Sequence, residues 1–176
     1  MTLSVLRFTE SIHGAVWDHL VRSRSRVEEA AFAYAVPTTE EAHLFDIVDW
    51  FAVDPSGFES RSAYHLELTD ETRARAIKHA HDLDASLVEL HSHVDGEPAR
   101  FSWSDLSGFR EFVPHVWWRL KGKPYFAIVA AANSYDGFSW RSSPDDTERL
   151  GAISVGALTL SPTHASNTRM EWPDDY

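Results

Sequence analysis

A pair of histidines at the end of an apolar segment is the feature that most constrains how this chain can fold. Residues 86–90 predict a β-strand, and His91 and His93 follow it with one residue between them. Side chains two positions apart on a strand point to the same face, so the two imidazoles would lie together. After a turn-rich loop, Ser102 and Asp105 begin a predicted helix. We therefore expect the loop to fold back and place the start of this helix beside the end of the strand.

The remaining pattern predicts a single α/β domain. A chain of 176 residues corresponds to about one domain on the usual prior of roughly 150 residues. The tail from Pro162 is polar and is expected to be loose. Helices are predicted over residues 10–21, 69–82 and 102–112, a turn over residues 133–137, and strands over residues 29–36, 43–53, 64–68, 86–90, 124–132, 138–141 and 153–160.

Composition excludes several classes of function. The chain has no cysteine, which excludes a disulfide framework, a thiol nucleophile and a thiolate metal site. Its formal net charge of −11 argues against nucleic acid or an anionic membrane as a partner, because phosphate groups need clustered Lys and Arg. The longest apolar runs, such as residues 127–132, are far shorter than the ~20 residues of a membrane span. Since residues 1–10 lack an apolar targeting core, we expect a cytoplasmic protein.

The histidine pair and Asp105 form a candidate metal site. Without cysteine, a metal must be held by His, Asp or Glu, and two imidazoles with one carboxylate leave the fourth position of a hydrolytic zinc open. Each part also has a structural interpretation. A His-x-His sequence is common on surfaces, and Ser102 with Asp105 fits a helix capping box. The capping and metal roles are compatible, because a capped first turn fixes where Asp105 points.

This joint pattern resembles the signature of the JAB/MPN metalloproteases, also called JAMM proteases. The resemblance implies that His91, His93 and Asp105 bind Zn²⁺ and that Ser102 helps to hold the tetrahedral intermediate. The spacer over residues 94–101 is one residue longer than is usual in the family.

The resemblance covers roughly residues 5–135 and is closest to the compact prokaryotic branch of the family. It implies a mixed β-sheet flanked by helices, with the layering of cytidine-deaminase-like proteins. On this basis residues 1–160 form the JAB/MPN domain, and residues 161–176 form a polar C-terminal tail.

The family also carries an upstream glutamate that handles the proton of the attacking water. Family members have Glu-x-Cys-Gly followed by an apolar strand, and Glu29 stands at the corresponding place, just after the first predicted helix. Ala31 and Phe32 occupy the Cys and Gly positions, so the match depends on the glutamate and its context. Glu28 is the competing candidate. We prefer Glu29 because it leads directly into the apolar strand.

The expected activity is that of a zinc-dependent peptidase or isopeptidase that cleaves after the C-terminus of a ubiquitin-like protein. Its partner would be that modifier or its conjugate, in a bacterial ubiquitin-like system. Two alternatives remain open: a metal-binding but inactive scaffold, and a zinc hydrolase of a small amide or a sulfur-carrier conjugate. The pattern also leaves open whether Glu89, on the same strand face as the histidines, orients one of them or faces the next layer. The oligomeric state is not predicted.

Overall fold

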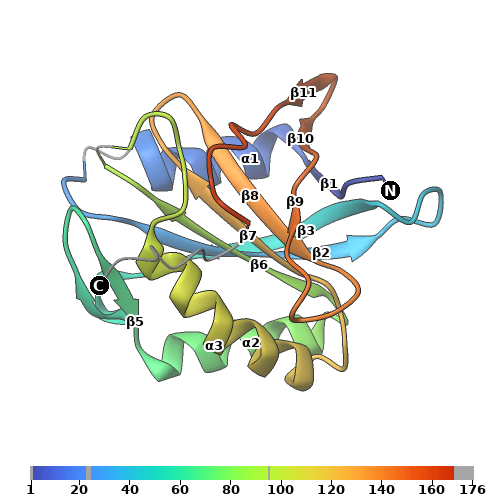
Figure 1. The fold of residues 1–176 in the computed structure, drawn as a ribbon, viewed down its shortest axis with the longest axis horizontal. Coiled ribbons are helices and arrows are strands. Elements are labelled where there is room, and N and C mark those ends of the chain that lie inside the picture. The colour runs from blue at the N-terminus through green and yellow to red at the C-terminus, as the bar shows by residue number, and fades with distance from the viewer. Residues whose placement is uncertain (1, 23–24, 95, 169–176) are drawn as a thin grey trace, which may run out of the picture.

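A mixed nine-stranded sheet forms the centre of the computed structural model, which describes residues 2–22, 25–94 and 96–168 (Figure 1). The strand order across the sheet is β11-β10-β1-β3-β2-β6-β7-β8-β9. A separate hairpin consists of β4 (Phe58–Arg61) and β5 (Leu66–Leu68). The strands of the large sheet are β1 (Val5–Phe8), β2 (Ala30–Pro37), β3 (Leu44–Ala52), β6 (Ser86–Ser92), β7 (Tyr125–Ala130), β8 (Tyr135–Trp140), β9 (Glu148–Arg149), β10 (Ala152–Val155) and β11 (Leu158–Leu160).

Helices cover both faces of this sheet and bury two separate apolar layers. Helix α1 (Glu10–Trp17) continues as a short π-helical turn (Asp18–Arg22) and packs on one face. Helices α2 (Asp70–Asp82) and α3 (Trp103–Arg119) pack on the other, as Figure 1 shows. The expected α/β class, with a mixed sheet flanked by helices, is therefore confirmed. None of the helices among the described residues is long and apolar enough to cross a lipid bilayer.

The central strand β6 determines which side chains reach the α2 and α3 layer. It pairs antiparallel with β2 and parallel with β7, so it lies inside the sheet. Leu87 packs in the layer under α2 and α3, whereas Val88 and Leu90 pack under α1. This alternation places His91 on the same face as Leu87, directed toward α3.

Several element boundaries differ from those expected from the sequence. Helix α3 ends at Arg119 and not near Phe112, because Val113 and Val116 bury their side chains against the sheet beyond the expected end. The single strand expected over residues 153–160 is two antiparallel strands, since Gly156 adopts a φ of +56° and turns the chain.

The described part of the C-terminal tail contacts the domain. We expected the tail from Pro162 onward to be loose, but Pro162 and Ser166 are buried. The Thr163 N–H donates to the carbonyl of Tyr135 at 2.8 Å, and the Thr163 hydroxyl donates to the carbonyl of Ala99 at 2.6 Å. Residues 169–176, the rest of the expected tail, lie outside the described residues.

Candidate metal centre

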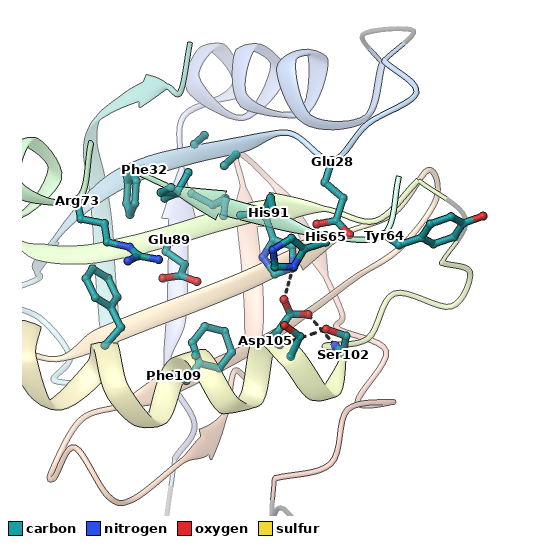
Figure 2. A pocket seen from close by; sticks show the side chains of 18 residues that line it. Glu28, Phe32, Tyr64, His65, Arg73, Glu89, His91, Ser102, Asp105 and Phe109 are labelled. Carbon is teal, nitrogen blue, oxygen red and sulfur yellow. Dashed lines mark hydrogen bonds and ion pairs between the residues drawn. The ribbon is translucent and has the colours of Figure 1, made fainter. Parts of the chain in front are cut away.

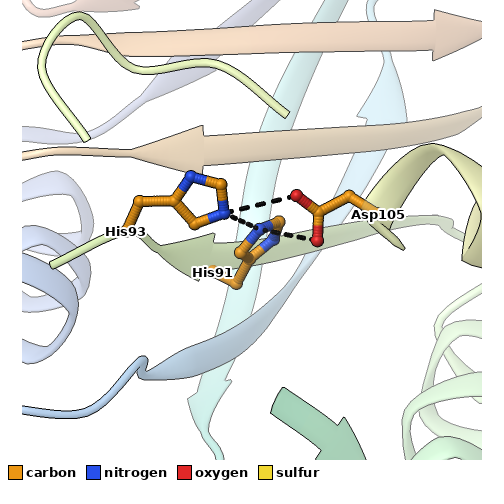
Figure 3. Close-up of side chains that lie close together, drawn as sticks. All are labelled: His91, His93 and Asp105. Atoms are coloured by element: carbon orange, nitrogen blue, oxygen red, sulfur yellow. Dashed lines mark hydrogen bonds and ion pairs between the residues drawn. The ribbon is translucent and has the colours of Figure 1, made fainter. Parts of the chain in front are cut away.

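The end of strand β6 brings His91 and His93 together on one side of the sheet. His91 is 4% exposed and is paired with Ala30 and Val129 in the neighbouring strands. His93 follows the strand, and its backbone N–H donates to the carbonyl of Ala130 at 2.9 Å. The Nε2 atoms of the two histidines lie 3.1 Å apart (Figure 3). The expected convergence of the pair is therefore observed.

The first turn of α3 supplies the third group. Ser102 is the N-cap, and its Oγ accepts a hydrogen bond from the Asp105 N–H at 3.1 Å. In return, Oδ2 of Asp105 accepts a hydrogen bond from the Ser102 N–H at 2.7 Å. This capping box fixes the carboxylate of Asp105 toward the end of β6, as expected. The structural and metal-binding interpretations of these two residues therefore describe the same geometry.

The three side chains lie close enough together to hold one metal ion, because one possible ligand atom from each lies within 4.8 Å of the other two. Nε2 of His91 lies 3.3 Å from Oδ1 of Asp105, and Nε2 of His93 lies 3.2 Å from Oδ2 of Asp105 (Figure 3). The two contacts involve different oxygens of the Asp105 carboxylate, so each histidine faces its own oxygen. Two imidazole nitrogens and one carboxylate oxygen also form a donor set that suits zinc. These residues could therefore hold a metal ion and leave a position open for a reactant.

The charges of the three groups are strongly coupled. Burial alone would lower the pKa of His91, but the charge and hydrogen bond of Asp105 outweigh it and raise that pKa to about 9. Burial alone would raise the pKa of Asp105, but the charge of His91 and hydrogen bonds from both histidines hold it well below its usual range. The carboxylate is therefore ionised at neutral pH, as a metal ligand must be.

Glu28, and not Glu29, lies beside the histidines. Oε1 of Glu28 is 3.9 Å from Nε2 of His93, and the side chain is buried. Figure 2 shows its carboxyl group directed toward His91. Burial raises the pKa of Glu28, while the charges of His91 and His93 act against this rise.

The carboxylate of Glu29 is held elsewhere by an ion pair with Arg61 at 2.8 Å. The cause is strand register. Ala30 pairs with His91, and the Glu29 N–H donates to Oγ of Ser92 at 2.9 Å, so Glu28 falls opposite His93 on the metal face. Our preference for Glu29 over Glu28 is corrected on this ground, because adjacent residues of an extended chain point to opposite faces.

Glu89 extends the site away from the metal centre. Its Oε2 accepts a short hydrogen bond from the Tyr125 hydroxyl, and no hydrogen bond joins it to either histidine within the described residues. Burial raises the pKa of Glu89, which the Tyr125 hydroxyl and the charge of His91 partly oppose. Of the two alternatives left open by the sequence, orientation of a ligand histidine is therefore not observed.

Sequence reasoning missed the residues that hold the loop before Ser102. The Phe101 N–H donates to Oγ of Ser166 at 2.9 Å, and the Ser166 N–H donates to Oδ2 of Asp136 at 2.9 Å. Asp136 is fully buried in β8, whereas the sequence predicts a turn at its position. The sequence feature that could have indicated this role is a carboxylate within a segment of otherwise uncharged residues.

Comparison with known proteins adds no family assignment. No protein-family model matches this sequence, and no curated protein matches it either. The likeness to JAB/MPN proteases therefore depends on the motif residues alone.

Proposed function

We propose that this protein is a zinc-dependent hydrolase of amide bonds. The observation that carries the proposal is the convergence of His91, His93 and Asp105, whose possible ligand atoms all lie within 4.8 Å of one another, with a buried glutamate beside them. Zn²⁺ in such a site lowers the pKa of a water molecule to about 7 and polarises a carbonyl oxygen. His91 is buried, and the partly buried carboxylate of Asp105 reaches both histidines from a different element, the first turn of α3.

In this proposal Glu28 is the residue that moves the proton. Its carboxyl group is 3.9 Å from His93 and is partly removed from water, which raises its pKa toward the range useful for a general base. Glu28 would accept a proton from the attacking water and pass it to the leaving nitrogen. The cleaved amide then gains both the hydroxyl at its carbonyl carbon and the proton at its amine.

Ser102 is placed to stabilise negative charge on the carbonyl oxygen. Its Oγ accepts the Asp105 N–H, so the hydroxyl proton is available for donation into the cavity that Ser102 lines. One such donor to an oxyanion typically contributes about 10²–10³ in rate. Ser102 therefore has two roles in this proposal, as the helix cap that fixes Asp105 and as a hydrogen-bond donor.

We further propose that the bond cleaved follows the C-terminus of a ubiquitin-like protein. Support for this substrate comes from the likeness of the His-Ser-His and Ser-x-x-Asp pattern to that of the JAB/MPN proteases. The geometry of the metal centre supports amide hydrolysis in general and does not select among substrates.

The experiment uses protein stripped with a chelator and reloaded with one equivalent of Zn²⁺. A panel of ubiquitin-like proteins, each with a peptide or an isopeptide-linked lysine at its C-terminus, is incubated with it, and products are detected by mass spectrometry. Glu28→Gln is expected to retain zinc and lose at least about 10²-fold in rate. Glu29→Gln, the matched variant one residue away, should keep the rate within a few-fold of wild type.

Equal losses in the two variants would contradict the assignment of Glu28. Full zinc loading with no cleavage of any fusion would instead favour a binding module that holds a metal without turnover.

A further inference from the structure

The cavity at the metal centre continues away from His91 into a recess between the sheet, α2 and α3. Phe32 and Phe109 form apolar walls, while Glu89 and Arg73 also line it. In Figure 2, Glu89 lies between His91 and Arg73. The whole cavity has a volume of about 120 Å³. This volume is more than one water molecule needs, so the cavity has room for a small group of a ligand.

Glu89 presents one oxygen to this recess. Oε2 is occupied by the Tyr125 hydroxyl, which approaches from the neighbouring strand β7. Oε1 has no hydrogen-bond partner within the described part of the chain. Oε1 is not one of the fully buried atoms without a partner, so it is open to the recess and can accept a hydrogen bond from a group that enters there.

Arg73 presents a guanidinium group from the opposite side of the recess. Its described contact is the ring of Phe112, with Cζ 5.5 Å from the ring centroid. Among the residues that the structure describes, neither an ion pair nor a hydrogen bond engages this guanidinium, and none joins it to Glu89. The two side chains are nevertheless close enough for the charge of Arg73 to act on Glu89. The recess is therefore lined by one acceptor oxygen, of Glu89, and one group of donors, of Arg73.

Glu89 and Arg73 restrict which chemical groups can bind in the recess. A lysine or arginine side chain has only donors and would leave Arg73 without an acceptor, and a carboxylate side chain has only acceptors and would leave Oε1 of Glu89 without a donor. An aliphatic side chain would leave both polar groups without water and without partners. An uncharged group with both an N–H donor and a carbonyl acceptor satisfies both sides.

We propose that this recess binds one uncharged polar side chain of the substrate, carrying a primary carboxamide as glutamine and asparagine do. The amide N–H donates to Oε1 of Glu89, and the amide oxygen accepts from Arg73. The inference rests on the proposed function in one respect, namely that the group bound belongs to a substrate cleaved at the adjacent metal centre. It makes Glu89 and Arg73 specificity-determining residues for that reaction.

The test measures binding directly, without cleavage. Zinc-loaded, ¹⁵N-labelled protein is titrated with N-acetyl-L-glutamine N-methylamide and, separately, with the N-acetyl N-methylamides of lysine, glutamate and norleucine, which carry no primary carboxamide. The glutamine derivative is expected to shift the Arg73 side-chain N–H and the backbone amides of Phe32 and Glu89 in a saturable way. The other three derivatives should cause much smaller shifts at the same concentrations.

Variants then assign the contacts. Arg73→Met and Glu89→Gln should each weaken binding of the glutamine derivative at least about fivefold, since each removes a hydrogen bond that involves a charged group. Arg75→Met is the matched control, because Arg75 lies on the same helix but stacks over Phe51, with Cζ 4.2 Å from the ring centroid. Arg73→Met keeps the test informative if Glu89→Gln does not fold.

Two results would overturn the inference: no shift of these signals by the glutamine derivative up to its solubility limit, or equal shifts by the norleucine derivative. The outcomes remain separate from those of the proposed function. A protein that binds the carboxamide probe but cleaves no fusion contradicts the proposed function alone. Cleavage without probe binding contradicts the recess assignment alone.

Discussion

The backbone N–H of Phe101 donates a hydrogen bond to Oγ of Ser166 at 2.9 Å, although the two residues are 65 positions apart in the chain. Phe101 directly precedes Ser102, the cap that fixes the carboxylate of Asp105. Both partners of this bond are buried. A C-terminal segment expected to be loose therefore helps to set the position of a metal-ligand candidate.

Ser166→Ala should destabilise the protein and weaken metal binding. The substitution leaves the Phe101 N–H buried without a partner, which typically costs about 1–3 kcal/mol. Urea unfolding of the metal-free protein measures the stability loss, and chelator competition measures the zinc affinity. Ser161→Ala is the control, because Ser161 is exposed. If Ser166→Ala matches wild type in both measurements, the loop is held without this bond.

The three predicted ligands should each be required for zinc. His93→Ala and Asp105→Asn are the informative variants, since the side-chain amide in the second variant keeps an acceptor oxygen for the Ser102 N–H and so preserves the helix cap. Loss of a residue that hydrogen-bonds to a metal ligand typically lowers metal affinity about 10–100-fold. Loss of a ligand itself should lower it further. Mass spectrometry of the purified proteins gives the zinc content.

His81→Ala serves as the control for the ligand variants, because His81 is exposed on the outer side of α2. Stoichiometric zinc in either ligand variant would show that the metal, if bound, is held at a different place.

Zinc affinity should rise steeply with pH. A histidine must be neutral to bind a metal, and the pKa of His91 in the metal-free protein is raised to about 9 by Asp105. Below that pH the imidazole carries a proton that zinc must displace. The apparent affinity should therefore increase about tenfold for each pH unit between roughly pH 6 and pH 8 and level off above about pH 9. Competition against a chelator of known pH dependence measures this slope, and a flat profile would contradict the coupling of His91 to Asp105.

The local parts of the site could be predicted from the sequence. His91 and His93 share a face because strand side chains alternate, and the Ser102–Asp105 capping box is a local pattern of a helix start. Each of these relationships involves residues within a few positions of one another. Their correct prediction required no knowledge of which strands are neighbours.

The glutamate could not be chosen in this way. Whether Glu28 or Glu29 faces the histidines depends on the register between β2 and β6, and a shift of one residue exchanges the two. Arg61, which binds Glu29, lies in a hairpin strand that local periodicity did not indicate. The roles of Arg73 and Asp136 likewise depend on packing between distant segments.

Asp136→Asn should destabilise the protein, because Asp136 belongs to the same hydrogen-bond network as Ser166. Asp136 is fully buried, and its carboxylate accepts backbone N–H groups from Gly137 at 2.9 Å, His164 at 3.2 Å and Ser166 at 2.9 Å. An asparagine amide places its own N–H groups against at least one of these donors, so a cost of about 1–3 kcal/mol is expected.

Urea unfolding of the single variants and of the Asp136→Asn/Ser166→Ala double variant tests this connection, with the exposed Asp145→Asn as the control. Residues in one hydrogen-bond network typically show interaction energies of about 0.5–3 kcal/mol. The double variant should therefore lose less stability than the sum of the single losses, because the Ser166 backbone is already released once Asp136 is replaced. Strictly additive losses would mean that Asp136 and Ser166 act independently. The hydrogen bonds of Ser166 would then not couple β8 to the N-cap of α3.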